Sequence, residues 1–164
     1  KNNYKLVDFG CGEGDMLNNI YNEKTYIKDI VGIELDNNGF QYFDERQINS
    51  LLTLLERLKK SFSIPTSKFI GHGDIAPTRK NDPNWRFPWK QLSDKGFGLW
   101  WSDTAKINQP KNVDYLTALR IIGYDVKDTS SAILGFKRHF MQDTTKGITP
   151  SAEKILYSLY KKYL

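Results

Sequence analysis

A histidine, a lysine and an aspartate lie close together in the segment FIGHGDIAPTRKNDP, residues 69–83. His72 and Asp82 are residue types that bind zinc, and an irregular loop between them would let both side chains approach one ion. Lys80 lies two residues before Asp82, so in an extended segment both side chains point to the same side. Such a lysine could stabilise an oxyanion that forms on an attacked carbonyl. The segment suits metal-assisted hydrolysis, although an exposed Lys80–Asp82 ion pair and a hydrogen-bonding surface histidine would also explain these residues.

The segment DIVGIELD, residues 29–36, supplies a candidate general base. Its apolar and polar residues alternate as in a strand, so Glu34 should face away from the apolar side of the sheet. A carboxylate in that position could take a proton from an attacking water molecule. Glu34 and Lys80 are therefore the candidate catalytic residues.

The elements that must position these side chains begin with three strands, expected near residues 5–9, 29–35 and 67–71. A helix is expected over residues 44–62, with Asp44 as its N-cap. One face of this helix carries the apolar residues Ile48, Leu51, Leu52, Leu55, Leu58 and Phe62. Pro77 and Pro83 exclude a regular helix or central strand through residues 69–83. That segment is therefore expected to be a long ordered loop.

Three further helices are expected after the polar stretch at 102–112. Asn112 would cap the first helix and Gly123 would end it, a second would cover 130–140, and a third would start at Thr149 and present Tyr163 on its apolar face. The predicted fold is therefore α/β, with a small mixed sheet packed by helices and a C-terminal three-helix module.

Composition is consistent with a folded globular chain: 164 residues, 39% hydrophobic and 13% aromatic. The single cysteine, Cys11, excludes an internal disulfide and a four-thiolate zinc site. The net charge of +5 comes from scattered lysines, so we expect no nucleic-acid partner. No apolar run reaches the length of a membrane span.

Four segments together resemble the zinc-dependent N-acetylmuramoyl-L-alanine amidases of bacteria, which cut the amide bond between muramic acid and the stem peptide. They are VGIELDNNGF, FIGHGDIAPTRKNDP, FPWKQL and GFGLW, and the later segments LRIIGYDV and FKRHF resemble the helical tail of longer members. The resemblance implies that His72 and Asp82 bind Zn²⁺ and that Glu34 and Lys80 serve catalysis.

The same resemblance implies a peptidoglycan or muropeptide substrate and a location in the periplasm or cell envelope. Arg79 and Trp85 flank the motif and are candidate substrate contacts, whereas Asp74 is expected to form hydrogen bonds within the loop.

The N-terminal residues depart from this family, in which another zinc-binding histidine lies well upstream. No histidine precedes His72, and the only other one, His139, lies in the helical tail, where we expect a structural role. The segment LVDFGCGEG instead resembles motif I of the class I S-adenosylmethionine-dependent methyltransferases. That resemblance implies S-adenosylmethionine binding by Gly10, Gly12 and Gly14, and a cytoplasmic location.

We therefore expect three regions: a methyltransferase-like segment at 1–30, an amidase-like catalytic region at 31–104 and a peptidoglycan-binding-like helical module at 105–164. The N-terminus would then be composite or truncated. The leading hypothesis is zinc-dependent hydrolysis of the amide between N-acetylmuramic acid and L-alanine. The alternatives are a non-catalytic wall-binding protein that lacks the first zinc ligand and a fragment of a methyltransferase.

Overall fold

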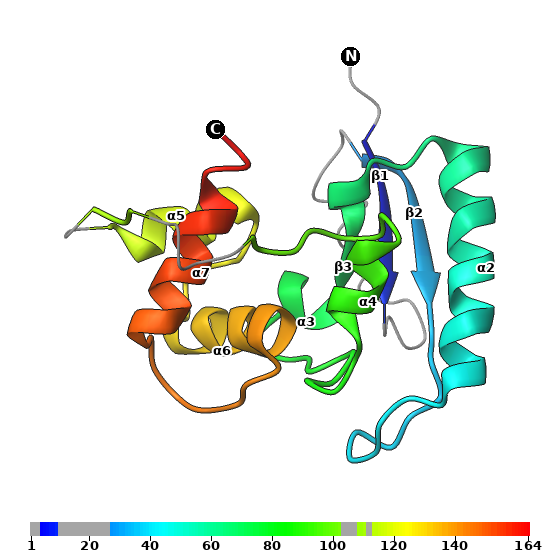
Figure 1. Cartoon of the computed structure of the whole chain (residues 1–164), viewed down its shortest axis with the longest axis horizontal. Coiled ribbons are helices and arrows are strands. Elements are labelled where there is room, and N and C mark those ends of the chain that lie inside the picture. The colour runs from blue at the N-terminus through cyan, green and yellow to red at the C-terminus, as the bar shows by residue number, and fades with distance from the viewer. Residues whose placement is uncertain (1–3, 10–26, 103–107, 111–112) are drawn as a thin grey trace.

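The computed structural model describes residues 4–9, 27–102, 108–110 and 113–164 (Figure 1). Its sheet has three strands, β1 (Tyr4–Phe9), β2 (Ile27–Ile33) and β3 (Phe69–Gly71), in the order β2-β1-β3. Both strand pairings are parallel, which differs from the predicted mixed sheet. Parallel neighbours need a long crossover, and residues 10–26 and 34–68 are long enough to provide one. The predicted α/β class is confirmed.

All three strands end at the same level. Phe9 of β1 pairs with Ile33 of β2 and with Gly71 of β3. Glu34 and His72 therefore each follow a strand at the carboxyl edge of the sheet. In open parallel sheets this edge is where ligands bind, because the loops that leave the strands gather there.

The long helix α2 (Glu45–Phe62) packs its apolar face on the sheet. The Asp44 carboxylate caps it by accepting a hydrogen bond from the Arg46 backbone N–H at 2.8 Å, as predicted. Ile48, Leu51 and Leu55 are buried in the core around the sheet. Phe62 differs from the prediction, since 40% of it is exposed at the end of the helix.

Short elements occupy the segment that follows α2. A 3₁₀ turn, η1 (Thr66–Lys68), leads into β3, and two helices follow, α3 (His72–Ile75) and α4 (Trp89–Asp94). The predicted continuous loop at 69–83 is wrong for its first part, because α3 ends before Pro77 and the proline removes none of its hydrogen bonds. Helix α4 is too short for its apolar spacing to indicate a helix.

The C-terminal module consists of α5 (Tyr115–Ile122), α6 (Thr129–Met141) and α7 (Pro150–Tyr160), which confirms the three predicted helices. Asp114 caps α5. The predicted cap, Asn112, lies outside the described residues. The Asp114 carboxylate accepts hydrogen bonds from the backbone of Leu116 and Thr117. Gly123 ends α5 at φ 115°, as expected. Tyr163 lies beyond α7 and is 42% exposed.

Two hydrophobic clusters hold these parts together. The first surrounds the sheet and extends from Val7 to Phe97, and the second fills the space between α5, α6 and α7. Trp100 packs against both clusters. Figure 1 shows α2 on one side of the sheet and α4, followed by the helical module, on the other.

Candidate functional site

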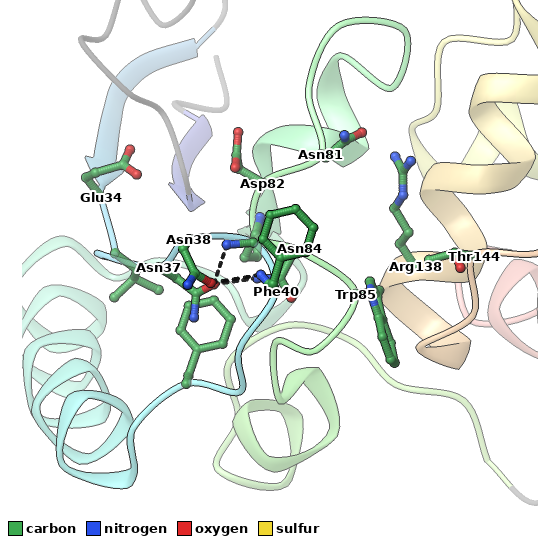
Figure 2. A pocket seen from close by; sticks show the side chains of 14 residues that line it. Glu34, Asn37, Asn38, Phe40, Asn81, Asp82, Asn84, Trp85, Arg138 and Thr144 are labelled. Atoms are coloured by element: carbon green, nitrogen blue, oxygen red, sulfur yellow. Dashed lines mark hydrogen bonds between the residues drawn. The ribbon is translucent and has the colours of Figure 1, made fainter.

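A pocket of about 400 Å³ lies at the carboxyl edge of the sheet (Figure 2). Three parts of the chain line it. Glu34 and the segment 35–43 follow β2, residues 81–85 come from the segment after α3, and Arg138 and Thr144 come from the helical module. The pocket is therefore formed between the sheet and the C-terminal helices.

Two carboxylates face this pocket. Glu34 is exposed directly after β2, on the polar side of the alternating pattern, as predicted. Asp82 is exposed on the segment that follows α3. Figure 2 shows the Glu34 side chain pointing towards the part of the pocket where Asp82 lies.

The loop between His72 and Asp82 folds back on itself. His72 is fully buried at the start of α3, immediately after β3. The Gly73 N–H donates a hydrogen bond to the Asp82 carbonyl oxygen at 2.7 Å, and the Lys80 N–H donates to the Ala76 carbonyl oxygen at 3.0 Å. The backbone of Gly73, the residue after His72, therefore lies beside the backbone of Asp82.

Glycine at position 73 leaves room for this close approach. A Cβ atom at Gly73 would lie 3.2 Å from the Lys80 carbonyl oxygen and 3.4 Å from that of Asp82. The sequence GHGD therefore allows the two ends of the motif to meet, which spacing alone could not show.

Asp74 ties the motif to the helical module. Its carboxylate accepts hydrogen bonds from the Gly71 N–H at 2.8 Å and from the Tyr124 hydroxyl at 2.5 Å, and it lies 2.6 Å from Nδ1 of His139. Burial and the neighbouring Asp74 charge raise the pKa of Tyr124 well above its usual value. The His139 ring stacks on Trp89 at 3.8 Å between centroids, so this buried histidine holds two parts of the molecule together.

Of the other predicted site residues in the described chain, Trp85 lines the pocket, whereas Arg79 and Lys80 do not. Trp85 lines the pocket, and the Arg86 guanidinium lies 4.3 Å from the centre of its ring. Lys80 is half-buried and Arg79 is exposed, and neither is part of the pocket lining in the described chain. Gly10, Gly12 and Gly14 lie outside the described residues.

Several pocket residues were not identified from the sequence. Asn37 and Asn84 come from different segments of the chain, and the Asn84 side-chain amide donates a hydrogen bond to the Asn37 side-chain oxygen at 2.9 Å, shown as a dashed line in Figure 2. The clusters of asparagine at 37–38 and 81–84 were a visible signal of polar lining. Arg138 lies more than 50 residues after the pocket residues at 34–43 and 81–85, so no local pattern could place it beside them.

The donor chemistry of the site suits zinc in part. A catalytic zinc takes three protein ligands, commonly histidine and carboxylate. Within the ranges that the structure describes, no group of three or more His, Cys, Asp or Glu side chains is placed to hold a metal ion. His72 and Asp82 are residue types that a catalytic zinc site uses.

Comparison with known proteins finds amidases by sequence and by structure, and AmiD of Escherichia coli appears in both. Residues 8–85 match the family model described as N-acetylmuramoyl-L-alanine amidase. The chain is 31% identical to the N-acetylmuramoyl-L-alanine amidase AmiD of Escherichia coli (strain K12), over 81% of this chain and 57% of AmiD. It is 39% identical to the 1,6-anhydro-N-acetylmuramyl-L-alanine amidase AmpD of Haemophilus influenzae, over 37% of this chain and 34% of AmpD.

Two solved structures are similar to the chain. One is AmiD from E. coli in complex with the substrate anhydro-N-acetylmuramic acid-L-Ala-D-gamma-Glu-L-Lys, with a TM-score of 0.69, 29% identity and coverage of 82% of this chain and 62% of that one. The other is AmpDh3 from Pseudomonas aeruginosa, with a TM-score of 0.69, 28% identity and coverage of 82% and 63%. The chain thus spans less than two thirds of the length of these relatives.

The family match starts at residue 8, well before the boundary near residue 30 that the methyltransferase interpretation required. The comparisons therefore do not favour that interpretation, nor the non-catalytic one. Residues 8–85 of this chain match the N-acetylmuramoyl-L-alanine amidase family, and the chain is homologous to the amidases AmiD and AmpD.

Proposed function

We propose that this chain is a zinc-dependent hydrolase that cuts the amide bond between N-acetylmuramic acid and L-alanine in peptidoglycan or in muropeptides released from it. The observation that carries the proposal is the position of Glu34 and Asp82 on one pocket at the carboxyl edge of the sheet, with the His72 segment hydrogen-bonded to Asp82. The relationship to AmiD and AmpD supports the choice of bond.

Four residues would have separate roles in this reaction. His72 and Asp82 would be two of the zinc ligands, and the ion, when bound, would supply Lewis-acid polarisation of the scissile carbonyl. Glu34 would accept the proton of the attacking water and pass it to the leaving amine of L-alanine. Lys80, two residues before Asp82, would stabilise the charge that develops on the carbonyl oxygen.

The rest of the pocket would bind substrate. Asn37, Asn84 and Trp85 offer amide groups and an aromatic ring, which suit a sugar bearing hydroxyl and acetamido groups. The substrate named for AmiD carries a stem peptide of L-Ala, D-γ-Glu and L-Lys on anhydro-N-acetylmuramic acid. We propose that this chain takes a substrate of the same class.

The proposed substrate also indicates where the protein acts and what its two regions do. We propose a location in the periplasm or cell envelope, a catalytic region that extends to about residue 104, and a helical module at 105–164 that contacts peptidoglycan. None of the helices in the described part of the chain is long and apolar enough to span a membrane.

The test is cleavage of a purified muropeptide, followed by mass spectrometry of the released sugar and peptide. The wild-type chain with zinc should release the stem peptide, and Glu34→Gln should lower kcat by at least about 100-fold, since it removes the general base. Glu45→Gln, an exposed carboxylate on α2, is the matched control and should retain the wild-type rate. Equal rates for wild type and Glu34→Gln would refute the proposed role of Glu34.

A further inference from the structure

Arg138 brings a positive charge from the helical module to the candidate site. It lies on α6 and lines the pocket together with Glu34 and Asp82 (Figure 2). In Figure 2 its side chain extends from the helix along the wall opposite Glu34, and its guanidinium lies level with Asn81. The two charged ends of the pocket are thus a carboxylate pair on one side and an arginine on the other.

The Arg138 guanidinium is half-buried and makes no ion pair or hydrogen bond with any residue that the structure describes. Burial lowers its pKa from the ordinary value for arginine, which reflects the loss of water around the charge. Arginine stays protonated even so, and its planar fork matches a carboxylate in a bidentate manner. A half-buried guanidinium without an acidic neighbour is suited to a carboxylate that arrives with the substrate.

The substrate class has such a group in a defined place. In a stem peptide that continues through D-γ-Glu, the γ-carboxyl is used for the next amide bond, and the α-carboxylate remains free. This carboxylate belongs to the residue after L-Ala, so it lies at most two residue lengths, roughly 7 Å, from the cleaved bond. A pocket of about 400 Å³ can hold both at once.

We propose that Arg138 binds the free α-carboxylate of the γ-linked second residue of the stem peptide, and so selects the acid form of that residue over its α-amide. The inference rests on the proposed function for the class of substrate. It assigns to the helical module a direct part in substrate recognition at the pocket.

The experiment compares two muramoyl tripeptides that differ only at this position, one with the free α-carboxylate and one with the α-amide. The wild-type chain should cleave the acid form with a kcat/KM about tenfold or more higher, the effect of a charge-assisted bidentate pair. Arg138→Gln should lower kcat/KM for the acid form mainly through KM, so that the acid-to-amide ratio approaches one. Arg138→Lys should keep part of the preference, because it retains the charge but not the fork.

Arg57→Gln is the matched control, since Arg57 is exposed on α2 and lies outside the pocket lining. Its acid-to-amide ratio should equal that of the wild type. Equal cleavage of both forms by the wild type, or an unchanged ratio in Arg138→Gln, would overturn the inference while leaving the amidase function intact.

A binding measurement tests the role of Arg138 independently of cleavage. Calorimetric titration of both tripeptides into Glu34→Gln and into Glu34→Gln/Arg138→Gln should show a preference for the acid form only when Arg138 is present. This preference without cleavage by the wild type would support the role of Arg138 and contradict the proposed function. Equal affinity of the two forms for Glu34→Gln would overturn the inference.

Discussion

The Asp74 carboxylate lies 2.6 Å from Nδ1 of His139, although 65 residues separate them in the sequence. The same carboxylate accepts the Tyr124 hydroxyl hydrogen bond at 2.5 Å and the Gly71 N–H at 2.8 Å. The turn that carries His72 is thereby fastened to α6 and to the segment that follows α5 in the C-terminal module. These contacts make the helical module part of the support of the candidate site.

Replacing Asp74 by alanine should destabilise the protein. The change leaves the buried groups of Tyr124 and His139 without their acceptor, and each unsatisfied group costs about 1–3 kcal/mol. We expect the free energy of unfolding in urea to fall by about 3 kcal/mol. Asp125→Ala, at an exposed position of the same module, should change it by less than about 0.5 kcal/mol. Similar values for the two variants would contradict the role of Asp74.

Tyr124 should make the stability fall at high pH. Its pKa in the folded chain is raised well above 10, first by burial and then by the charge of Asp74 and the hydrogen bond to it. The unfolded chain releases this proton near pH 10 while the folded chain keeps it, so the stabilisation is complete below pH 10 and is lost as the pH rises above it. Between pH 10 and pH 11 the loss from this residue should be about 1 kcal/mol.

Urea unfolding at pH 8, 10 and 11 measures this loss. Tyr124→Phe should be less stable than the wild type at pH 8, since it lacks the hydrogen bond, but its stability should fall less steeply above pH 10. Tyr42→Phe, at an exposed position, is the matched control. A decline in Tyr124→Phe as steep as that of the wild type would show that another group causes the effect.

Gly71→Ala should disturb the segment that carries Asp82. A Cβ atom at this position would lie 2.9 Å from Cδ of Pro83, 3.1 Å from the Trp89 ring and 3.2 Å from the Asp74 carboxylate. The backbone there has φ −91°, so alanine itself is not strained, and the cost arises from crowding. We expect a loss of about 1–3 kcal/mol in the free energy of unfolding. An unchanged unfolding midpoint would mean that Pro83 moves away without cost.

Periodicity and capping residues predicted much of the fold. The helix at Glu45–Phe62 and its buried face followed from apolar spacing, and the third C-terminal helix followed from Thr149 and Pro150. The strand at Ile27–Ile33 followed from alternation, which also placed Glu34 on the open side. These are local patterns, so a single sequence contains them. The short helix at Trp89–Asp94 has too few residues to show a period.

Long-range contacts of the candidate site could not be predicted in this way. Asp74 was expected to form hydrogen bonds within its loop, and it does bond the Gly71 N–H, but its other two partners come from the helical module. Arg138 reaches the pocket because α6 packs closely on α3, where a Cβ atom at Gly135 would lie 3.1 Å from the Gly73 carbonyl oxygen. Such contacts depend on how the two hydrophobic clusters dock, which no local pattern encodes.

Zinc binding by His72 and Asp82 is tested directly by the zinc content of the purified chain after equilibration with zinc and removal of the excess. We expect about one zinc ion per wild-type chain and a clear loss of zinc in Asp82→Ala and His72→Ala, as each removes one proposed ligand. Asp82 is exposed, so its variant should remain folded, and Asp94→Ala, another exposed carboxylate, should keep the wild-type zinc content. A wild-type chain without zinc, or an Asp82→Ala chain with the full amount, would contradict the proposed zinc site.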